Sequence, residues 1–293
     1  MEINFGFAAI RQQPRGIRNP MKTPLATATR LARRASGTRA AVRMLPEETP
    51  VALSYGGTTH AVMMASPVDL EDFAVGFSLT EGIVSSLEEI QAIEVAQAGE
   101  GIDVQIRLKD VAGARFLARR RHLAGPVGCG LCGIESIDEA LRRVSDVRGA
   151  GAVFSSADIV HAVRLLSKAQ PMHAETGAVH AAGLYMAGQG IAAAREDVGR
   201  HNALDKLAGA LARSGIDASQ GAVVLTSRVS VEMVQKAAAI GSAAVFAVSA
   251  PTALAVRTAE EAGMMLVALV RGEDFDIFTH PERMTAGDSH DVA

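Results

Sequence analysis

The two cysteines of the chain, Cys129 and Cys132, are separated by two residues in the segment "GPVGCGLCG", and the other 291 residues contain no cysteine. A cysteine thiolate is both a nucleophile and a soft metal ligand, so this pair could transfer sulfur, exchange disulfides or bind a metal ion. Four glycines surround the pair and give the backbone wide conformational freedom. We therefore expect sulfur chemistry on a mobile loop.

Two of the three chemistries find little support in the sequence. A closed zinc site requires two further ligands, and there is no second C-x-x-C. The "HAE" at His173 to Glu175 resembles the H-x-E of zinc deaminases, but it follows the cysteines, whereas in those enzymes it precedes them. Dithiol–disulfide exchange typically uses a helix that begins at the first cysteine beside an aromatic residue, and no aromatic residue is close. Zinc-dependent hydrolysis and disulfide exchange therefore stay as alternatives.

Sulfur carriage suits the segment best. In this chemistry a thiolate accepts a sulfane sulfur as a persulfide and passes it on. Positive charge and a helix N-terminus both favour the thiolate. Arg119 to Arg121 precede the pair, and "SIDEALRRV" behind it opens with the capping box Ser136 to Glu139.

A second group of reactive side chains lies at a junction between a strand and a helix, in "GIAAAREDVGRHNALDK". His201 could move a proton, and Asp197 or Asn202 could cap the helix. The alternative is a plain cap with ion pairs, in which Lys206 only supports Asn202 or Asp205. His180, in the apolar "AVHAAGL", is expected to be a core residue rather than a catalyst.

The final third of the chain predicts a parallel sheet. Apolar strands at 221–227, 243–250 and 264–272 alternate with helices at 230–241 and 252–263, which favours a sheet covered on both faces by helices. Ligands bind such sheets beyond the carboxyl ends of the strands, where helix N-termini attract phosphate. Of the residues that follow these strands, Arg228 and Arg271 are the expected phosphate contacts, and a surface salt bridge is the alternative for each. Ser249 follows the second strand.

The first half predicts antiparallel strands with one central helix. Strand pairs are expected at 50–66 and 90–108, and a helix at 66–82 with Ser66 as its N-cap and Pro67 in its first position. A capped amphipathic helix at 155–169 and a hairpin at 178–199 follow. The fold class is therefore α/β with an antiparallel N-terminal part.

Charge is unevenly distributed. The net charge is −3, but residues 1–43 contain nine Lys or Arg and one acidic residue, which predicts a basic, disordered arm. With an acidic body and 4% aromatic residues, we do not expect nucleic-acid binding. No apolar run approaches the roughly 20 residues of a membrane span, and the chain start lacks a signal-peptide pattern. We expect a cytoplasmic protein.

Seven segments, in order, resemble the formate dehydrogenase accessory sulfurtransferases, the FdhD/NarQ family. The resemblance covers roughly residues 50 to 282, and its most specific parts are "GCGLCG" and "EDVGRHNALDK". One departure is "TGAVH", where Ala178 stands in place of a second glycine found in many members. The other five segments are "DLEDFAVGFSLTEGI", "ETGAVHAAGL", "SRVSVEMVQKAAAIG", "AVSAPTALAV" and "LVALVRG".

The resemblance implies a cytidine-deaminase-like α/β fold and a role in cofactor maturation. Family members accept persulfide sulfur from a cysteine desulfurase and pass it to the molybdenum cofactor, bis-molybdopterin guanine dinucleotide, destined for formate dehydrogenase. By motif, Cys129 corresponds to the persulfide-carrying cysteine and Cys132 to its partner. The cofactor-binding segment corresponds to the end of the last strand, namely Leu269, Val270, Arg271, Gly272, Glu273, Asp274 and Phe275.

The sequence therefore predicts a sulfur carrier with no metal of its own. Its cofactor-binding residues are predicted to be segment 269–275 together with Arg228, Ser249 and His201. Its predicted partners are the desulfurase, the catalytic subunit of formate dehydrogenase and the molybdenum cofactor. A homodimer is common for folds of this kind, but the sequence does not set the oligomeric state. The alternative is a non-catalytic cofactor chaperone. The expected divisions of the chain are an arm (1–43), a strand and helix part ending in the cysteine loop (44–134), an α/β domain (135–283) and a tail (284–293).

Overall fold

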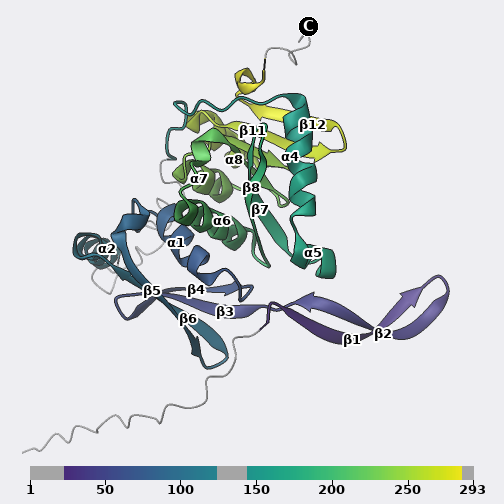
Figure 1. The fold of residues 1–293 in the computed structure, drawn as a ribbon, viewed down its shortest axis with the longest axis horizontal. Coiled ribbons are helices and arrows are strands. Elements are labelled where there is room, and N and C mark those ends of the chain that lie inside the picture. Colours follow the sequence, from purple (N-terminus) through teal and green to yellow (C-terminus); the bar gives the residue numbers. More distant parts are fainter. Residues whose placement is uncertain (1–22, 124–143, 286–293) are drawn as a thin grey trace, which may run out of the picture.

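The computed structural model describes residues 23–123 and 144–285 of the chain. Its strands form three sheets, of two, four and six strands (Figure 1). The two-stranded sheet projects from the body, the four-stranded sheet forms one side of the body, and the six-stranded sheet forms its centre. The Sequence-based prediction of an α/β protein with an antiparallel N-terminal part is therefore confirmed.

The six-stranded sheet has the order β12-β11-β10-β9-β7-β8. Its members are β7 (His180–Met186), β8 (Gly190–Asp197), β9 (Ala222–Leu225), β10 (Ala244–Ala247), β11 (Met265–Arg271) and β12 (Asp274–Thr279). Strands β9, β10 and β11 are parallel, and β7 with β8 forms the hairpin, as predicted. Strand β12 was not predicted. It pairs antiparallel with β11, so segment 269–275 forms the end of β11, a tight turn and the start of β12, rather than the end of the last strand.

Helices cover both faces of this sheet. One core cluster joins alternate strand residues to α6 (Arg200–Ser214), α7 (Val231–Ala239) and α8 (Ala253–Ala262). On the opposite face, a second cluster joins the remaining strand residues to α4 (Ser156–Lys168). The predicted cap of α4 is confirmed, and Ser155 forms it as a capping box with Asp158. The short helix α5 (Pro171–Thr176) connects α4 to β7.

The four-stranded sheet has the order β4-β3-β6-β5 and packs one face on α1 (Leu70–Thr80). Its strands are β3 (Thr49–Tyr55), β4 (Thr58–Ala65), β5 (Ile90–Ala98) and β6 (Gly101–Leu108), and α2 (Asp110–Leu123) follows β6. Helix α1 begins at Leu70, so the predicted start with Ser66 as N-cap is wrong. Ser66 is engaged elsewhere, because its backbone N–H donates to Asp197 and its hydroxyl accepts from the N–H of Val198.

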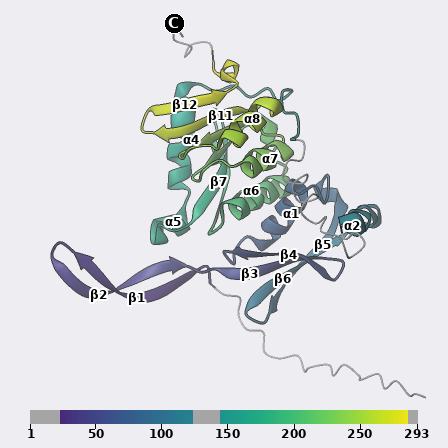
Figure 2. The same ribbon diagram turned by 180° about the vertical axis from the view of Figure 1, so that it is seen from behind.

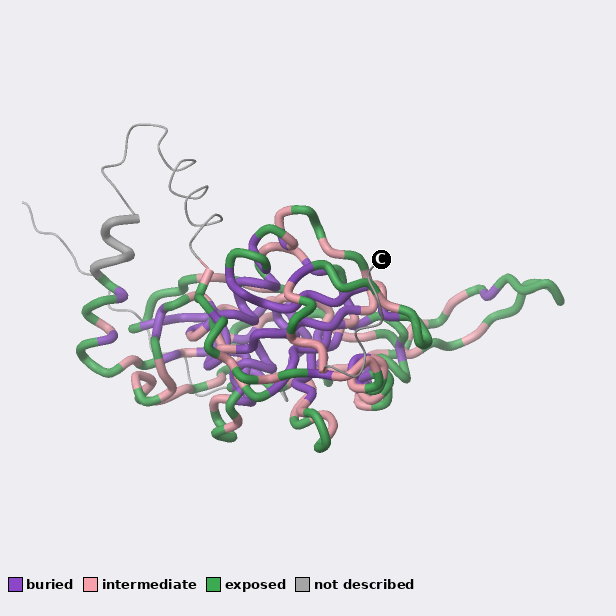
Figure 3. Tube along the Cα trace, turned by 90° about the horizontal axis from the view of Figure 1, so that it is seen from above, coloured by how far each residue is buried: buried purple, intermediate pink, exposed green. Residues whose placement is uncertain are grey.

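The basic arm is folded where the structure describes it. Strands β1 (Leu25–Arg34) and β2 (Gly37–Pro46) pair along ten residues each, so the predicted disorder of residues 1–43 is wrong for 25–43. Residues 1–22 lie outside the described part. Threonines and small apolar residues between the arginines favour extended strands, a pattern that charge composition alone conceals. Figures 1 and 2 show this arm extending away from the body, and Figure 3 shows that most of it is exposed.

Helices α1 and α6 cross at very short distance because glycines line the contact. A Cβ atom added to Gly76 would lie 1.7 Å from the carbonyl oxygen of Asp205, and one added to Gly209 would lie 1.9 Å from that of Asp72. Only a residue without a side chain lets the two backbones approach this far. Since α1 carries the four-stranded sheet and α6 covers the six-stranded sheet, this contact joins the two parts of the body.

Substituting either glycine by alanine is expected to force the helices apart. We predict that Gly76→Ala and Gly209→Ala each lower the free energy of unfolding by about 3 kcal/mol, the upper range for overpacking. The matched control is Gly113→Ala on α2, where a new Cβ would meet no heavy atom closer than 4.0 Å. The control should be neutral or stabilise the protein by up to about 1 kcal/mol through helix propensity. Urea unfolding followed by circular dichroism measures all three, and equal effects would contradict the packing argument.

Candidate functional site at the carboxyl edge of the sheet

Several elements converge at one edge of the six-stranded sheet. Strands β9, β10 and β11 end there, β7 begins there, and β8 ends there opposite the start of β7. Helices α6, α7 and α8 begin at the same edge. The polar residues that the sequence places after these strands therefore surround a common rim, as expected for a sheet of this topology.

Much of the polar cluster at 195–202 serves structure. Asp197 and Lys206 form an ion pair of 2.6 Å, and both side chains are fully buried. Asp197 also accepts hydrogen bonds from the backbone N–H groups of Ser66 and Gly199 and from the side chain of Asn202. Lys206 donates to the carbonyl of Ser66. A buried pair with its remaining hydrogen-bonding groups satisfied in this way holds its surroundings in one arrangement.

These contacts join the two parts of the body. Asn202 also donates to the carbonyl of Met64, at the end of β4. Neither Asp197 nor Asn202 caps α6, whose N-cap is Gly199 and which has no side-chain cap, so the predicted cap is wrong. Lys206 binds Asp197 rather than supporting Asn202 or Asp205.

A second buried cluster centres on Lys236 of α7 and includes Asp205 of α6. Lys236 of α7 binds Asp205 at 2.8 Å and Glu81 at 2.6 Å, and it donates to the hydroxyl of Thr80. Burial alone would lower the pKa of Lys236, but the two carboxylates outweigh it and raise this pKa. The lysine is therefore charged, and it connects the end of α1 to α6 and α7.

An arginine pair completes the contact. Asp72 of α1 binds Arg195 of β8 at 2.7 Å and Arg213 of α6 at 2.5 Å. Glu196 accepts from the backbone N–H groups of Met172 and His173, which fixes the start of α5. Arg195, Glu196, Asp197 and Asn202 are thus committed to packing, which leaves Arg200 and His201 to face the rim.

Unsatisfied polar atoms mark the rim where α6 and α7 begin. Among the described residues, Arg200 Nε and Ser230 Oγ at this rim are buried without a hydrogen-bond partner, as are Arg30 Nε, Thr49 Oγ1, Gln97 Oε1 and Gln170 Oε1 elsewhere. His201 Nε2 lies 2.6 Å from a carboxylate oxygen of Glu232 and makes no other polar contact that satisfies it. Buried polar atoms are rarely left unpaired unless a ligand or a partner group satisfies them. This rim is therefore the best candidate for a contact with a reacting group.

Two imidazoles near this rim have lowered pKa values. For His201, burial is the main cause, Glu232 opposes it, and Arg200 and Lys236 add to it. For His180, half-buried at the start of β7, burial is again the main cause, followed by the charge of Arg200. Both rings are therefore neutral at pH 7 and can accept a proton.

Cys129 and Cys132 lie outside the described residues. Val144 and Ser145, which directly follow the segment 124–143, line a cavity of about 420 Å³. Arg115 of α2, Thr80 and the buried Gln235 of α7 line it as well. Gln235 neighbours Lys236 and lies one turn beyond Glu232, so this cavity adjoins the α7 side of the His201 rim.

The predicted cofactor segment lies on the opposite face of the sheet from His201. Within 269–275, Val270 and Phe275 pack in the core beneath α4, Leu269 adopts a left-handed backbone with φ of 58°, and 271–274 form an exposed turn. Glu273 of this turn lines a cavity of about 580 Å³ against α4. The structure therefore places Val270, Phe275 and Glu273 on the α4 side of the sheet, whereas His201 begins α6 on the other side. Arg228 and Ser249 follow β9 and β10 at the rim itself.

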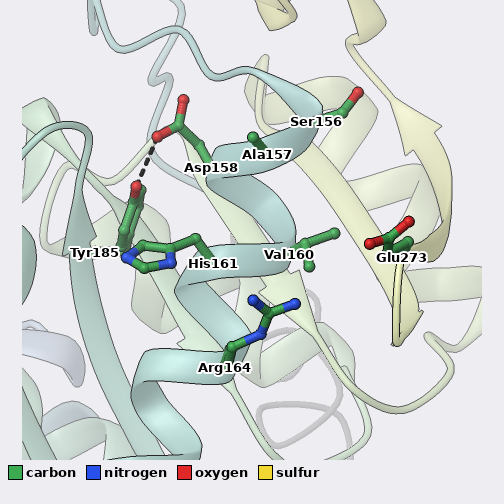
Figure 4. A pocket seen from close by; sticks show the side chains of 8 residues that line it. All are labelled: Ser156, Ala157, Asp158, Val160, His161, Arg164, Tyr185 and Glu273. Atoms are coloured by element: carbon green, nitrogen blue, oxygen red, sulfur yellow. Dashed lines mark hydrogen bonds between the residues drawn. The ribbon is translucent and has the colours of Figure 1, made fainter.

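The α4 cavity is lined by polar side chains spaced one turn apart. Figure 4 shows Asp158, His161 and Arg164 along one face of α4, with Glu273 across from them. The hydroxyl of Tyr185 donates to Asp158 at 2.6 Å. Burial alone would raise the pKa of Asp158, but hydrogen bonds from Ser155 and Tyr185 lower it, so the carboxylate is ionised. The cavity thus offers a cation, an imidazole and carboxylates to a polar ligand.

The other predicted phosphate contacts follow the strand ends. Arg228 is exposed after β9, and Arg271 is exposed at the end of β11. Ser249, after β10, accepts at its carbonyl from the N–H of Leu269, so these two segments lie side by side. Binding of a phosphate-bearing ligand by these residues stays a prediction.

Three further findings concern the described residues alone. In that part of the chain, no group of three or more His, Cys, Asp or Glu side chains is arranged to hold a metal ion. His173 and Glu175 of the "HAE" segment lie on α5, and His173 Nδ1 contacts the carbonyl of Val179. No helix in 23–123 or 144–285 is long and apolar enough to span a membrane.

Comparison with known proteins decides the family. The model of the FdhD/NarQ family matches residues 46–285. The chain belongs to the FdhD/NarQ family. It is 62% identical over 242 residues to the sulfur carrier protein FdhD of Agrobacterium fabrum, with 83% of this chain and 89% of that protein covered. It is 56% identical over 254 residues to the same-named protein of Brucella abortus, with 87% and 94% covered.

A solved structure agrees in fold. A crystal structure described as that of a formate dehydrogenase accessory protein from Desulfotalea psychrophila superposes with a TM-score of 0.69 at 27% identity. The superposition covers 89% of this chain and 99% of that one. The family match begins at residue 46, so the arm formed by β1 and most of β2 lies outside it.

Several residues of this family member escaped sequence reasoning. Asp72 and Glu232 looked like ordinary helix carboxylates, and Arg164 and His161 looked like the polar face of an amphipathic helix. Their importance comes from contacts more than 25 residues away along the chain. The spacing of 158, 161 and 164 was the one available signal, because it places three polar side chains on one face of a helix.

The balance of charges around His201 yields a titration prediction. Glu232 raises the pKa of His201 against the effect of burial, so Glu232→Gln should lower that pKa further below 6.5. The matched control is Glu282→Gln. Glu282 raises the pKa of His280, so this variant should lower the pKa of His280 and leave that of His201 unchanged. NMR titration of the histidine ring protons measures both, and an unchanged His201 in Glu232→Gln would contradict the assigned contact.

Proposed function

We propose that this protein is a cytoplasmic sulfur carrier that accepts sulfane sulfur from a cysteine desulfurase and passes it to the molybdenum cofactor of formate dehydrogenase. The observation that carries the proposal is the glycine-flanked pair Cys129 and Cys132, the complete cysteine inventory of a chain 62% identical to a protein named as a sulfur carrier. The chemistry of thiolates, the family motifs and the names of the relatives all support this function.

Loading is a thiolate–persulfide exchange. The thiolate of Cys129 attacks the outer sulfur of the desulfurase persulfide, so a new sulfur–sulfur bond forms and the desulfurase bond breaks. The desulfurase cysteine leaves as a thiolate, and the step involves no net oxidation. A neutral His201 at the rim, with its lowered pKa, is suited to take the thiol proton of the attacking cysteine.

Release of the bound sulfur from Cys129 requires Cys132. When the thiol of Cys132 attacks the inner sulfur of the Cys129 persulfide, the outer sulfur leaves as hydrosulfide and a Cys129–Cys132 disulfide forms. The two thiol groups supply the two electrons that reduce sulfane sulfur to sulfide. A cellular thiol reductant must then restore the pair for the next cycle.

We place the acceptor cofactor at the α4 cavity. Glu273 belongs both to the predicted cofactor segment and to the cavity wall, and about 580 Å³ suits a nucleotide-sized group. Arg164 in the wall and Arg271 at the turn are the cations available to phosphates there.

The sulfur-carrier proposal predicts different masses for the two cysteine variants. After incubation with a cysteine desulfurase and cysteine, intact-protein mass spectrometry should show one added sulfur on the wild type. Cys132→Ser should retain that sulfur, because it cannot form the releasing disulfide, and Cys129→Ser should gain none.

The readout of function is the activity of the client dehydrogenase. Both variants should fail to mature formate dehydrogenase while still binding the cofactor. If the Cys129→Ser variant matures the dehydrogenase normally, sulfur transfer by this cysteine is ruled out, and the non-catalytic chaperone is the function that remains. Stoichiometric zinc with no protein-bound sulfane sulfur would instead favour the hydrolase alternative.

Placement of the acceptor predicts which arginines bind its nucleotide. With GDP as the probe, Arg164→Glu and Arg271→Glu should each weaken binding about tenfold or more, because a charged hydrogen bond to phosphate becomes a repulsion. The control is Arg257→Glu, an exposed arginine on α8 at the other face of the sheet. Isothermal titration calorimetry measures the affinities. Equal affinity for GDP in all three variants would contradict the placement of the acceptor at the α4 cavity.

A further inference from the structure

Residues 280–285 form a turn after β12 that connects α8 to the chain before α4. The turn contains the short helix η3 (Pro281–Arg283). The guanidinium of Arg283 donates to four backbone carbonyl groups, which belong to Val147, Arg148, Ala150 and Gly263. Gly263 ends α8, and the other three residues lie in the segment that leads into α4. One side chain of the turn therefore holds two other segments in place.

The backbone of the turn also pairs with the chain where α4 begins. The N–H of Phe154 donates to the carbonyl of Arg283, and the N–H of Thr285 donates to the carbonyl of Phe154. Phe154 is buried in the core beneath α4, and the next residue, Ser155, is the N-cap of that helix. Figures 1 and 2 show the turn beside this end of α4. The turn therefore sets the position of the chain next to Ser156, which lines the α4 cavity.

His280 binds the turn to α8 through two groups that can only accept a proton. Its Nδ1 lies 2.6 Å from a carboxylate oxygen of Glu282, and its Nε2 lies 3.0 Å from the backbone carbonyl oxygen of Glu260. Glu282 is ionised, because its hydrogen bond with His280 lowers its pKa. A neutral imidazole carries one N–H and an imidazolium carries two. Both contacts therefore form only when His280 is a cation.

The charges around the ring favour that cation. Burial alone would lower the pKa of His280, but the hydrogen bonds with Glu260 and Glu282 and the charges of both carboxylates outweigh it and raise this pKa. The carboxylate of Glu260 lies 3.8 Å from Nε2. The arginines of the neighbouring segments have other partners, since Arg283 binds the carbonyl groups named above and Arg148 pairs with an aspartate at 2.7 Å.

The backbone at His280 depends on these contacts. Its φ of 52° and ψ of 54° lie in the left-handed region, which costs energy for a residue with a side chain and persists only where the surroundings hold it. Only 16% of the His280 side chain is exposed. Losing one of the two ring contacts therefore leaves a strained backbone with less to hold it.

We propose that turn 280–285 is a pH-sensitive latch, closed on α8 and on the chain before α4 while His280 is protonated and opening when the ring becomes neutral. In an open turn the imidazole has its ordinary pKa of about 6.5. Since the closed turn raises that pKa, His280 stabilises the closed turn fully below about pH 6.5. This stabilisation is lost as the pH rises through the higher pKa of the closed turn.

Amide hydrogen exchange measured by NMR between about pH 6 and pH 9 tests the latch. The N–H groups of Phe154 and Thr285 report opening of the turn, and the N–H of Met265, bonded to the carbonyl of Ala243 in the buried sheet, reports global unfolding. After correction for the intrinsic pH dependence of exchange, the protection factors of Phe154 and Thr285 should fall above about pH 6.5, by up to about tenfold per pH unit. They should stay below that of Met265 at every pH, because the turn opens without the sheet.

Variants assign the pH dependence to one ring. In His280→Asn, which tolerates a left-handed backbone, protection of Phe154 and Thr285 should be about tenfold lower at pH 6 and should not vary with the ionisation of a ring. Glu282→Gln keeps the histidine and should shift the fall in protection to lower pH. The matched control is Glu261→Gln, an exposed carboxylate on α8 beside Glu260, which should keep the wild-type profile.

Three outcomes would overturn the proposal. They are wild-type protection of the turn that is constant between about pH 6 and pH 9, a His280→Asn variant with the wild-type profile, and equal protection of the turn and of Met265. Circular dichroism checks that each variant is folded, and Glu282→Gln still tests the latch if His280→Asn does not fold. Neither sulfur loading nor GDP binding is a readout here, so failure of the latch leaves the proposed function untouched.

Discussion

The crossing of α1 and α6 is the contact on which the rest of the body depends. Gly76 and Gly209 let the two backbones touch, and buried charges then fix the arrangement from both sides. Lys206 with Asp197 connects α6 to the end of β4, and Lys236 with Asp205 connects α7 to the end of α1. Each buried charge has a partner, so losing one side chain leaves another charge stranded in a low-dielectric interior.

The contact between α1 and α6, with the buried ion pairs beside it, also determines which groups are left for chemistry. In the "EDVGRHNALDK" segment, Asp197, Asn202 and Lys206 bind groups in the contact between the two parts of the body. Arg200 and His201 at the start of α6 then lie at the rim. The cavity beside Val144 adjoins the same side of the sheet, while the α4 cavity with Glu273 lies on the other side. The six-stranded sheet therefore lies between the two cavities.

Local patterns predicted the elements well and the long-range contacts poorly. The strands of the final third, the capping box at Ser155 and the hairpin at 178–199 follow from periodicity and turn chemistry. The start of α1 and the caps of α6 were wrong, because Asp197 binds Ser66 and Asn202 binds the carbonyl of Met64, each across more than 100 residues of chain. The arm was wrong because its composition suggested disorder, whereas its alternation of small and β-branched residues sets a ladder.

Only those features of the candidate site that depend on local spacing could be predicted from the sequence. Glycine-flanked cysteines and the residues after parallel strands are visible in the sequence, since both depend on local spacing. The separation of His201 from segment 269–275 depends on which face of the sheet each element covers, and only the three-dimensional arrangement sets that.

The role of buried charge in the contact between the two parts is tested most directly by Lys206→Met, which keeps the side-chain bulk and removes the charge. We predict a loss of about 3–5 kcal/mol in the free energy of unfolding in urea, because Asp197 is left buried without its cation. Arg107→Met is the matched control, since Arg107 and Glu94 are 64% and 70% exposed at 3.6 Å, and it should change stability by no more than about 1 kcal/mol. Equal stability of the two variants would contradict the claim that buried charge holds the two parts together.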